Sequence, residues 1–241
     1  MKNILIGITA GIAIYKIPNL IRLLRKNNFN VKILMTPNAV KLINPIIFQS
    51  LTNNKVYYKL FDNADFDIEH ISLARWADLI VIAPATANTI NKITNGIADN
   101  LLLNVILSTT AKILIVPAMN KNMYLNYITQ ESIKKLKERE IYFLGPEEGE
   151  LACGEIGIGK MVNENLIFEK ISTILNEKND LKNYNILITA GACREKIDDV
   201  RFISNYSSGK QGYQIAKAAY LRGANVTLIS GYSTLEMPFI K

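Results

Sequence analysis

The sequence contains very little histidine, cysteine or tryptophan: one His, two Cys and one Trp in 241 residues. Cys153 and Cys193 form no CxxC pair, and a single His leaves few ligands for a metal, so we expect no metal site. The scarcity of cysteine also argues against a disulfide-stabilised secreted protein. The low cysteine content instead predicts a protein of the reducing cytoplasm.

Long apolar runs are missing as well. No stretch approaches the ~18 consecutive apolar residues of a membrane-spanning helix. The N-terminus, MKNILIGITAGIAIYKI, superficially resembles a signal peptide, but Lys16 interrupts the apolar run and no small-residue cleavage site follows it. We therefore expect a soluble protein with no membrane partner.

The sequence also has no block of one charge. The formal net charge is +7, but the basic residues are dispersed and mixed with acids, as in KKLKERE at 134–140. Such mixing is typical of a solvated helix face, so nucleic acid is not an expected partner. With 49% hydrophobic residues, the chain can fill the core of one large domain or a domain and a half.

Strand and helix patterns alternate from the N-terminus, which predicts an α/β fold with a doubly wound, Rossmann-like parallel sheet. Asn3–Thr9 predicts the first strand, followed by a turn at Ala10-Gly11 and a helix over roughly Ile12–Asn27. Val31–Met35 predicts the second strand. Neither a GxGxxG motif nor an acid after the second strand is present, which argues against an NAD-dependent dehydrogenase.

Hydroxyl and amide side chains follow several predicted strands. Thr36 follows the second strand, and Thr86–Thr89 follows a strand that we expect Pro84 to end. Ala118–Asn120 follows a buried strand at Ile113–Val116. Each turn alone fits ordinary helix capping, and Thr9, Gly11 and Thr36 fit plain turn chemistry as well as a phosphate site. Together, at one edge of a parallel sheet, they indicate a ligand site.

Three separated motifs then resemble one family: HISLARWADLIVIAPATANTINKITNGIADNLL from His70, VPAMNKNMY from Val116, and GPEEGELACGEIGIGKM over Gly145–Met161. They resemble the FMN-dependent cysteine decarboxylases, specifically the phosphopantothenoylcysteine decarboxylase domain of the bifunctional coenzyme A biosynthesis flavoproteins. The family's Pro-x-Met-Asn-x-x-Met and ACG-x-x-G-x-G-[RK]-M patterns are intact. The resemblance covers roughly residues 3–175.

The resemblance implies catalytic roles for His70 and Cys153, and substrate binding by Asn120 and Met123, with Asn120 holding the substrate carboxylate. It implies FMN as cofactor, in contact with Ala10, Gly11, Ile12, Thr36, Thr86, Ala87, Asn88, Thr89, Ala118 and Met119. It also implies a homo-oligomer, trimeric or larger, with FMN at a subunit interface, and leaves open whether His70 acts in its own chain's site or in a neighbour's.

The implied reaction is decarboxylation of N-(4'-phosphopantothenoyl)-L-cysteine to 4'-phosphopantetheine. Direct loss of CO2 would leave a carbanion with no electron sink, whereas oxidation of the thiol by flavin creates one. His70 would act as a base or hold the reacting group, and Cys153 would donate a proton from a glycine-rich flap.

The sequence also allows other interpretations of these residues and of the whole chain. Without its glycine-rich frame, Cys153 would read as a small buried hydrophobe, and Met119 and Met123 as core filler. The whole chain could instead be a non-catalytic FMN-binding regulatory protein of the same fold, a peptidyl-cysteine decarboxylase or a flavin-prenylating relative.

The C-terminal part predicts a linker at 177–183 between a domain at 1–176 and the start of a second α/β domain at 184–241. RFISNYSSGK, over Arg201–Lys210, resembles the opening of phosphopantothenate–cysteine ligase and implies substrate binding by Arg201 and Asn205. About 58 residues are too few for that domain, so we expect no ligase activity. Mg2+ and CTP would be required only by a complete ligase domain.

Overall fold

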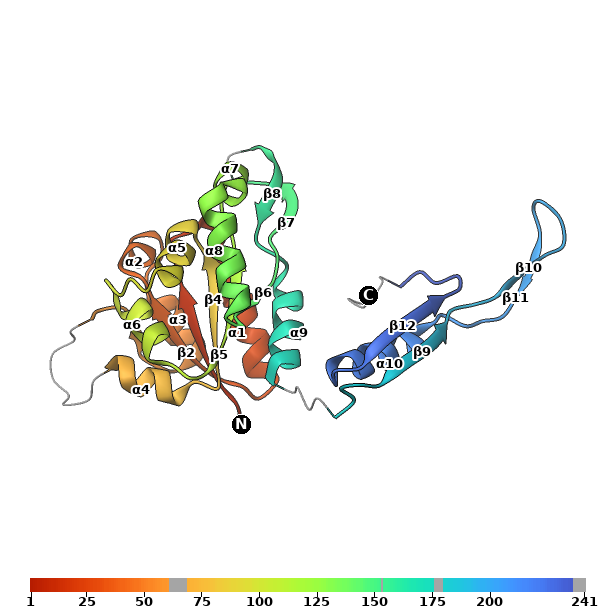
Figure 1. Ribbon diagram of the computed structural model, residues 1–241, viewed down its shortest axis with the longest axis horizontal. Helices are drawn as coiled ribbons and strands as arrows, with labels where there is room; N and C mark the ends of the chain where they lie inside the picture. Colours follow the sequence, from red (N-terminus) through yellow and green to blue (C-terminus); the bar gives the residue numbers. More distant parts are fainter. Residues whose placement is uncertain (61–68, 153, 176–179, 236–241) are drawn as a thin grey trace. The chain divides into compact units, whose positions relative to one another are not determined.

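The computed structural model describes residues 1–60, 69–152, 154–175 and 180–235, and the chain divides into two compact units, Met1–Leu175 and Asn176–Lys241. The first unit is built on a six-stranded sheet in the order β3-β2-β1-β4-β5-β6, with parallel pairing throughout (Figure 1). This confirms the predicted doubly wound α/β fold. The strands are β1 Asn3–Ile8, β2 Asn30–Met35, β3 Val56–Tyr57, β4 Leu79–Ala85, β5 Lys112–Pro117 and β6 Tyr142–Phe143.

Helices cover both faces of this sheet, which explains why its strands are apolar at successive positions. On β1, Ile4, Ile6 and Ile8 pack with one layer of helices, and Leu5 packs with the other. Burying each such side chain stabilises the fold by roughly 1.5–3 kcal/mol. The first layer contains α1 Ile17–Lys26, α3 Ile46–Thr52 and α9 Glu164–Leu175; the second contains α4 Glu69–Trp76, α5 Ala87–Thr94, α6 Leu101–Ser108 and α8 Tyr127–Glu138.

Shorter elements complete the first unit around the carboxyl ends of the strands. They are the 3₁₀ helix η1 Ile12–Lys16, α2 Pro37–Leu42 and α7 Lys121–Leu125, with the antiparallel hairpin of β7 Glu147–Glu150 and β8 Ile156–Lys160. Figure 1 shows α7 and the β7–β8 hairpin at one end of the sheet and α4 at the other.

Two boundary predictions are wrong. The single helix predicted over Ile12–Asn27 is η1 followed by α1, because Pro18 lacks an N–H and is tolerated only in a helix's first turn. The β4 strand does not end at Pro84 but continues to Ala85, across an irregularity in its pairing with β5. Proline fits there because the regular ladder is already interrupted.

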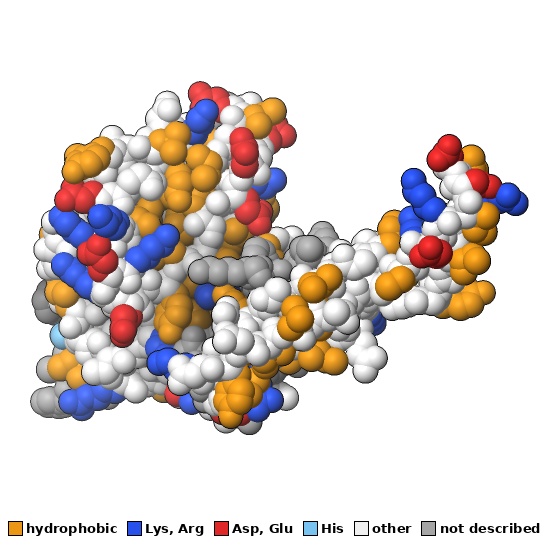
Figure 2. Space-filling view, turned by 45° about the vertical axis from the view of Figure 1, so that its right-hand side comes forward, with side chains coloured by type: hydrophobic (Ala, Val, Ile, Leu, Met, Phe, Trp, Pro, Cys, Tyr) orange, Lys and Arg blue, Asp and Glu red, His pale blue; other side chains and the backbone are white. Residues whose placement is uncertain are grey.

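The second unit pairs β9 Asn185–Ala190 with β12 Asn225–Ser230 in parallel, and α10 Lys210–Leu221 packs on one face of the pair. Between them, β10 Arg194–Lys196 and β11 Phe202–Ser204 form an antiparallel hairpin. Figure 2 shows hydrophobic side chains on the surface of this unit, and Leu187 and Ile229 are 65% and 55% exposed.

Within the described residues, no helix is long and apolar enough to cross a membrane. In the same residues, no group of three or more His, Cys, Asp or Glu side chains is arranged to hold a metal ion.

Candidate functional site

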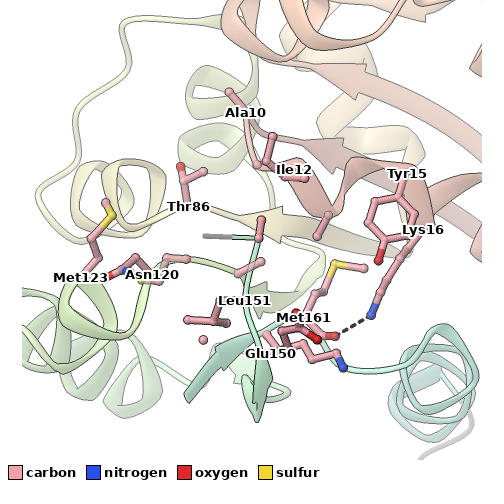
Figure 3. Close-up of a pocket in the computed structure, with 17 residues that line it drawn as sticks. Ala10, Ile12, Tyr15, Lys16, Thr86, Asn120, Met123, Glu150, Leu151 and Met161 are labelled. Atoms are coloured by element: carbon pink, nitrogen blue, oxygen red, sulfur yellow. Dashed lines mark hydrogen bonds between the residues drawn. The ribbon is translucent and has the colours of Figure 1, made fainter. Parts of the chain in front are cut away.

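The carboxyl ends of β1, β4 and β5 surround a cavity of about 630 Å³ (Figure 3). The strands are parallel, so their exits meet at one edge, the usual ligand position in such sheets. In the view of Figure 3, Asn120 and Met123 lie at one side of the cavity and Tyr15 and Lys16 at the other. The residues predicted from the sequence that line it are Ala10, Gly11, Ile12, Thr86, Ala118, Met119, Asn120 and Met123.

A smaller cavity of about 190 Å³ shares Ala10 and Thr86 with the larger one. Its lining is polar and includes Thr36, Asn88 and Thr89 together with Lys92, whose ammonium pairs with Asp99. Ala87, which the sequence predicts to contact FMN, is buried at the start of α5 and lies between Thr86 and Asn88 in the sequence.

Thr9 ties the exits of β1 and β4 together. Its buried hydroxyl donates to the Pro84 carbonyl at 2.7 Å and accepts from the Thr86 N–H at 3.1 Å. The Thr86 hydroxyl in turn caps α5 by accepting from the Thr89 N–H at 3.4 Å. The threonines at this edge therefore set the backbone geometry on which both cavities depend.

Asn120 caps α7 with its side-chain oxygen, which accepts from the Asn122 N–H at 2.8 Å. This bond fixes the orientation of the amide, so that Nδ2 faces the segment leading into β8. There it donates to Oε2 of Glu155 at 3.1 Å. The amide is thus oriented as a hydrogen-bond donor to a carboxylate.

The β8 strand lies unusually close to the exit of β5. The Met119 N–H donates to the Gly159 carbonyl at 3.0 Å. Gly159 has φ +146°, and a Cβ atom there would lie 2.1 Å from the Met119 carbonyl oxygen. Only glycine allows this approach, which brings the β7–β8 hairpin against the cavity.

Sequence reasoning missed several residues of the larger cavity. Tyr15, Lys16, Glu150 and Lys160 all line it, and the Lys16 ammonium donates to the Met161 carbonyl at 2.9 Å. Lys16 carried no recognisable signal because its partner lies 145 positions later.

His70 is not among the described residues that line either cavity. It lies in the first turn of α4, whose far end reaches the amino edge of the sheet: the Asn3 side chain donates to the Trp76 carbonyl at 3.0 Å. The predicted site residues of the carboxyl edge are therefore brought together without His70. Cys153 lies outside the described residues.

In the second unit, a separate cavity of about 670 Å³ is lined by Cys193 and by residues 206–212, among others. Arg201 and Asn205, predicted to bind substrate there, are not among its described lining residues. Arg201 instead pairs with Asp198 at 2.6 Å and holds the pKa of that carboxyl below its ordinary value. The Asn205 side chain accepts from the Ser207 N–H at 2.9 Å.

The two cavities of the first unit offer a complementary pair of environments. Apolar side chains such as Ile12, Ala118, Met119 and Met161 can pack against a planar ring. Hydroxyl, amide and ammonium groups in the smaller cavity can bind a phosphate near the start of α5. A ligand with an aromatic ring and a phosphate fits this arrangement.

Comparison with known proteins identifies the family of this chain. A family model described as "Flavoprotein" matches residues 1–176, and one described as "DNA/pantothenate metabolism flavoprotein C-terminal domain" matches residues 181–240. Among solved structures, a PPC decarboxylase mutant complexed with pantothenoylaminoethenethiol has a TM-score of 0.64 at 27% identity, covering 72% of this chain and 97% of that one. The FMN binding protein AtHal3 has a TM-score of 0.62 at 28% identity, covering 72% and 96%.

The sequence relatives are similar over nearly the whole chain. The coenzyme A biosynthesis bifunctional protein CoaBC of Haemophilus influenzae is 47% identical over 238 residues, which are 98% of this chain and 60% of that protein. This chain thus spans about 60% of the length of that relative. Because the first family model covers well over half of the chain, and the relative matches nearly all of it, the chain belongs to the flavoprotein family that includes the bifunctional coenzyme A biosynthesis proteins.

Proposed function

We propose that this chain catalyses the FMN-dependent decarboxylation of N-(4'-phosphopantothenoyl)-L-cysteine to 4'-phosphopantetheine. The observation that carries the proposal is the Asn120 amide, oriented by its cap on α7 and facing a carboxylate beside a cavity suited to a flavin. The relatives named as coenzyme A biosynthesis proteins and the PPC decarboxylase of the same fold support this substrate.

FMN would occupy both cavities of the first unit. Ile12, Ala118 and Met119 would contact its ring system, and Thr36, Asn88 and Thr89 would bind its phosphate, with the turns at Ala10–Gly11 and Thr86–Ala87 forming the walls. When bound, FMN supplies the two-electron oxidation of the substrate thiol that makes loss of CO2 possible. The structure of a relative described as FMN binding supports the same cofactor.

The chain's own side chains would position the substrate and move its protons. Asn120 would donate to the substrate carboxylate and hold it until CO2 leaves. Met123, 48% exposed beside Asn120, would pack against the cysteinyl part of the substrate. Cys153 would supply the proton that completes the product.

We infer that His70 acts in the site of a neighbouring copy in a homo-oligomer, trimeric or larger. Within one chain it lies on α4, away from the cavities. Large apolar side chains that line the larger cavity are exposed: Ile12, Tyr15 and Met123 are 65%, 67% and 48% exposed. Apolar side chains gathered at a surface are typical of a subunit interface.

A mixing experiment tests this placement. We expect the His70→Asn and Asn120→Ala variants each to be nearly inactive alone; they are unfolded and refolded together in equal amounts. If a site takes His70 from one copy and Asn120 from the next, random mixing restores about a quarter of the wild-type activity in a closed ring. Recovery of no activity would mean that both residues serve the same chain's site.

We further propose that residues 1–176 form the decarboxylase domain, that 177–183 link it to the unit at 184–241, and that the protein works in the cytoplasm. The second unit resembles the pantothenate-metabolism domain that matches it. Mg2+ and CTP would belong to ligase chemistry in a complete domain of that type, with Arg201 and Asn205 as substrate contacts.

Asn120→Ala tests the proposed carboxylate-binding role, with Asn126→Ala as a matched control. Asn126 is also a helix cap, since its side chain accepts from the Ile128 N–H at 3.0 Å. Both changes should cost about 1 kcal/mol of stability. Only Asn120→Ala should lower CO2 release, by about 100-fold or more, while FMN binding is kept. Equal activities of the two variants would contradict the role.

A further inference from the structure

Glu155 places a carboxylate on the amide nitrogen of Asn120. Its Oε2 accepts the 3.1 Å hydrogen bond from Asn120 Nδ2, although the two residues are 35 positions apart. The Asn120 amide cannot turn Nδ2 away without losing its bond from Asn122, because Oδ1 would leave with it. The donor therefore has a fixed direction, and Glu155 meets it.

The backbone around Glu155 holds this carboxylate in place. Glu155 directly precedes β8, which the Met119–Gly159 hydrogen bond joins to the exit of β5. On the other side, the Glu155 carbonyl accepts from the Leu151 N–H at 2.9 Å, and Leu151 lines the cavity. These bonds hold the Glu155 backbone beside the exit of β5, and its exposed side chain reaches Asn120 from there.

We propose that Glu155 is a specificity-determining residue that occupies the Asn120 donor in the ligand-free enzyme and is displaced by the carboxylate of the substrate. The inference rests on the proposed function, in which Asn120 binds the cysteinyl carboxylate. Both groups are carboxylates, and each would accept a hydrogen bond from the same amide nitrogen, which brings the two negative charges together. Two carboxylates at one donor repel each other, so binding of one requires withdrawal of the other.

This exchange has consequences at both ends of the reaction. The Asn120 donor stays hydrogen-bonded whether the site is free or filled, so no unpaired amide is left in either state. A ligand without a carboxylate offers Asn120 Nδ2 no charged acceptor in place of Glu155, so it has no advantage over Glu155 at this position. Once CO2 has left, the product no longer competes, and Glu155 returns to Asn120 as the product leaves.

Two probes that differ only in the carboxylate test the proposal. One is 4'-phosphopantothenoylserine, whose hydroxyl replaces the oxidisable thiol, and the other is its decarboxylated counterpart, the ethanolamine amide of 4'-phosphopantothenate. Both are titrated calorimetrically into the full FMN-loaded protein. The variants are Glu155→Ala, Glu155→Gln and, as control, Glu148→Ala, which removes an exposed acid from β7 of the same hairpin.

Glu155→Ala should bind the serine probe about 5–10-fold more tightly than the wild type, since a competing charge-assisted hydrogen bond is gone. Glu155→Gln should give a smaller gain, because its amide oxygen still accepts from Asn120. The ethanolamine probe should change less than about twofold, and Glu148→Ala should change neither. In the Asn120→Ala background, Glu155→Ala should no longer favour the serine probe.

Weaker binding of the serine probe to Glu155→Ala, or an equal change for both probes, would overturn the proposal while leaving the proposed function intact. It would show that Glu155 supports Asn120 or the hairpin instead of competing for the donor. A wild-type protein that takes up FMN but binds neither probe would overturn the proposed function and this inference together.

Discussion

Gly159→Ala gives the sharpest test of how the β7–β8 hairpin is held against the cavity. The added Cβ would lie 2.1 Å from the Met119 carbonyl oxygen, whereas real Cβ contacts essentially never fall below 3.0 Å. The two backbone segments would have to move apart by about 0.9 Å, which strains the Met119–Gly159 hydrogen bond. Neither contact partner is a flexible side chain, so the structure has no inexpensive way to relax.

The size of the effect follows from two terms. Overpacking costs roughly 1–3 kcal/mol, and a non-glycine residue at a sparsely populated φ costs a further ~1–3 kcal/mol. A total near ~4 kcal/mol corresponds to a fall in Tm of about 8–16 °C for a domain of this size. CO2 release should fall as well, because Glu150 and Leu151, which line the cavity from the hairpin, lose their position beside Asn120.

Gly96→Ala is the matched control. Gly96 also has a positive φ, +67°, but nothing lies within 4 Å of its added Cβ. It should carry only the backbone cost of roughly 1–2 kcal/mol. Melting curves of the FMN-loaded variants, followed by circular dichroism and by flavin fluorescence, separate the two. A Gly159→Ala protein that melts with Gly96→Ala and keeps full turnover would refute the close-approach argument.

Two further changes test the edge of the sheet and its amino end. Thr9→Val leaves the Pro84 carbonyl and the Thr86 N–H without their shared partner, which should cost ~1–3 kcal/mol of stability and weaken FMN binding. Thr94 is also buried, and Thr94→Val, as the control, should leave FMN affinity unchanged. The hydrogen bond from the Asn3 N–H lowers the pKa of the Asp78 carboxyl, and the Lys2 ammonium lowers it further. Asp78 therefore stabilises the fold above the unfolded pKa of ~3.9, and this contribution to stability is lost as the pH falls through the lower folded pKa. Asp78→Asn should therefore be less stable than the wild type in denaturant titrations at pH 7, with the difference shrinking below about pH 4; a constant difference down to pH 2 would contradict this assignment.

The strands and the ligand edge could be predicted because they depend on local signals. Strands buried on both faces are largely apolar, so the sequence predicts β1, β2 and β5 to within a residue of their ends. The carboxyl ends of parallel strands meet at one edge of the sheet, so the sequence predicts that Thr86 and Asn120 lie near each other, and both line the larger cavity.

The remaining features depend on partners distant in sequence. The contact of Glu155 with Asn120 and the bond from Lys16 to Met161 have no local pattern, because each joins segments that only the folded sheet brings together. The extension of β4 past Pro84 depends on its irregular pairing with β5. For His70, the motif marks a residue type, but no sequence pattern states which copy of the chain it serves.

The most direct test of the proposed function is the stoichiometry of a single reaction. Protein purified with FMN is given 4'-phosphopantothenoylcysteine labelled at the carboxyl carbon, and CO2 and 4'-phosphopantetheine are measured together over many turnovers. We expect equal amounts of the two products and a flavin that ends each turnover oxidised. A protein that takes up no FMN, or one that consumes the thiol without releasing CO2, would contradict the proposed function.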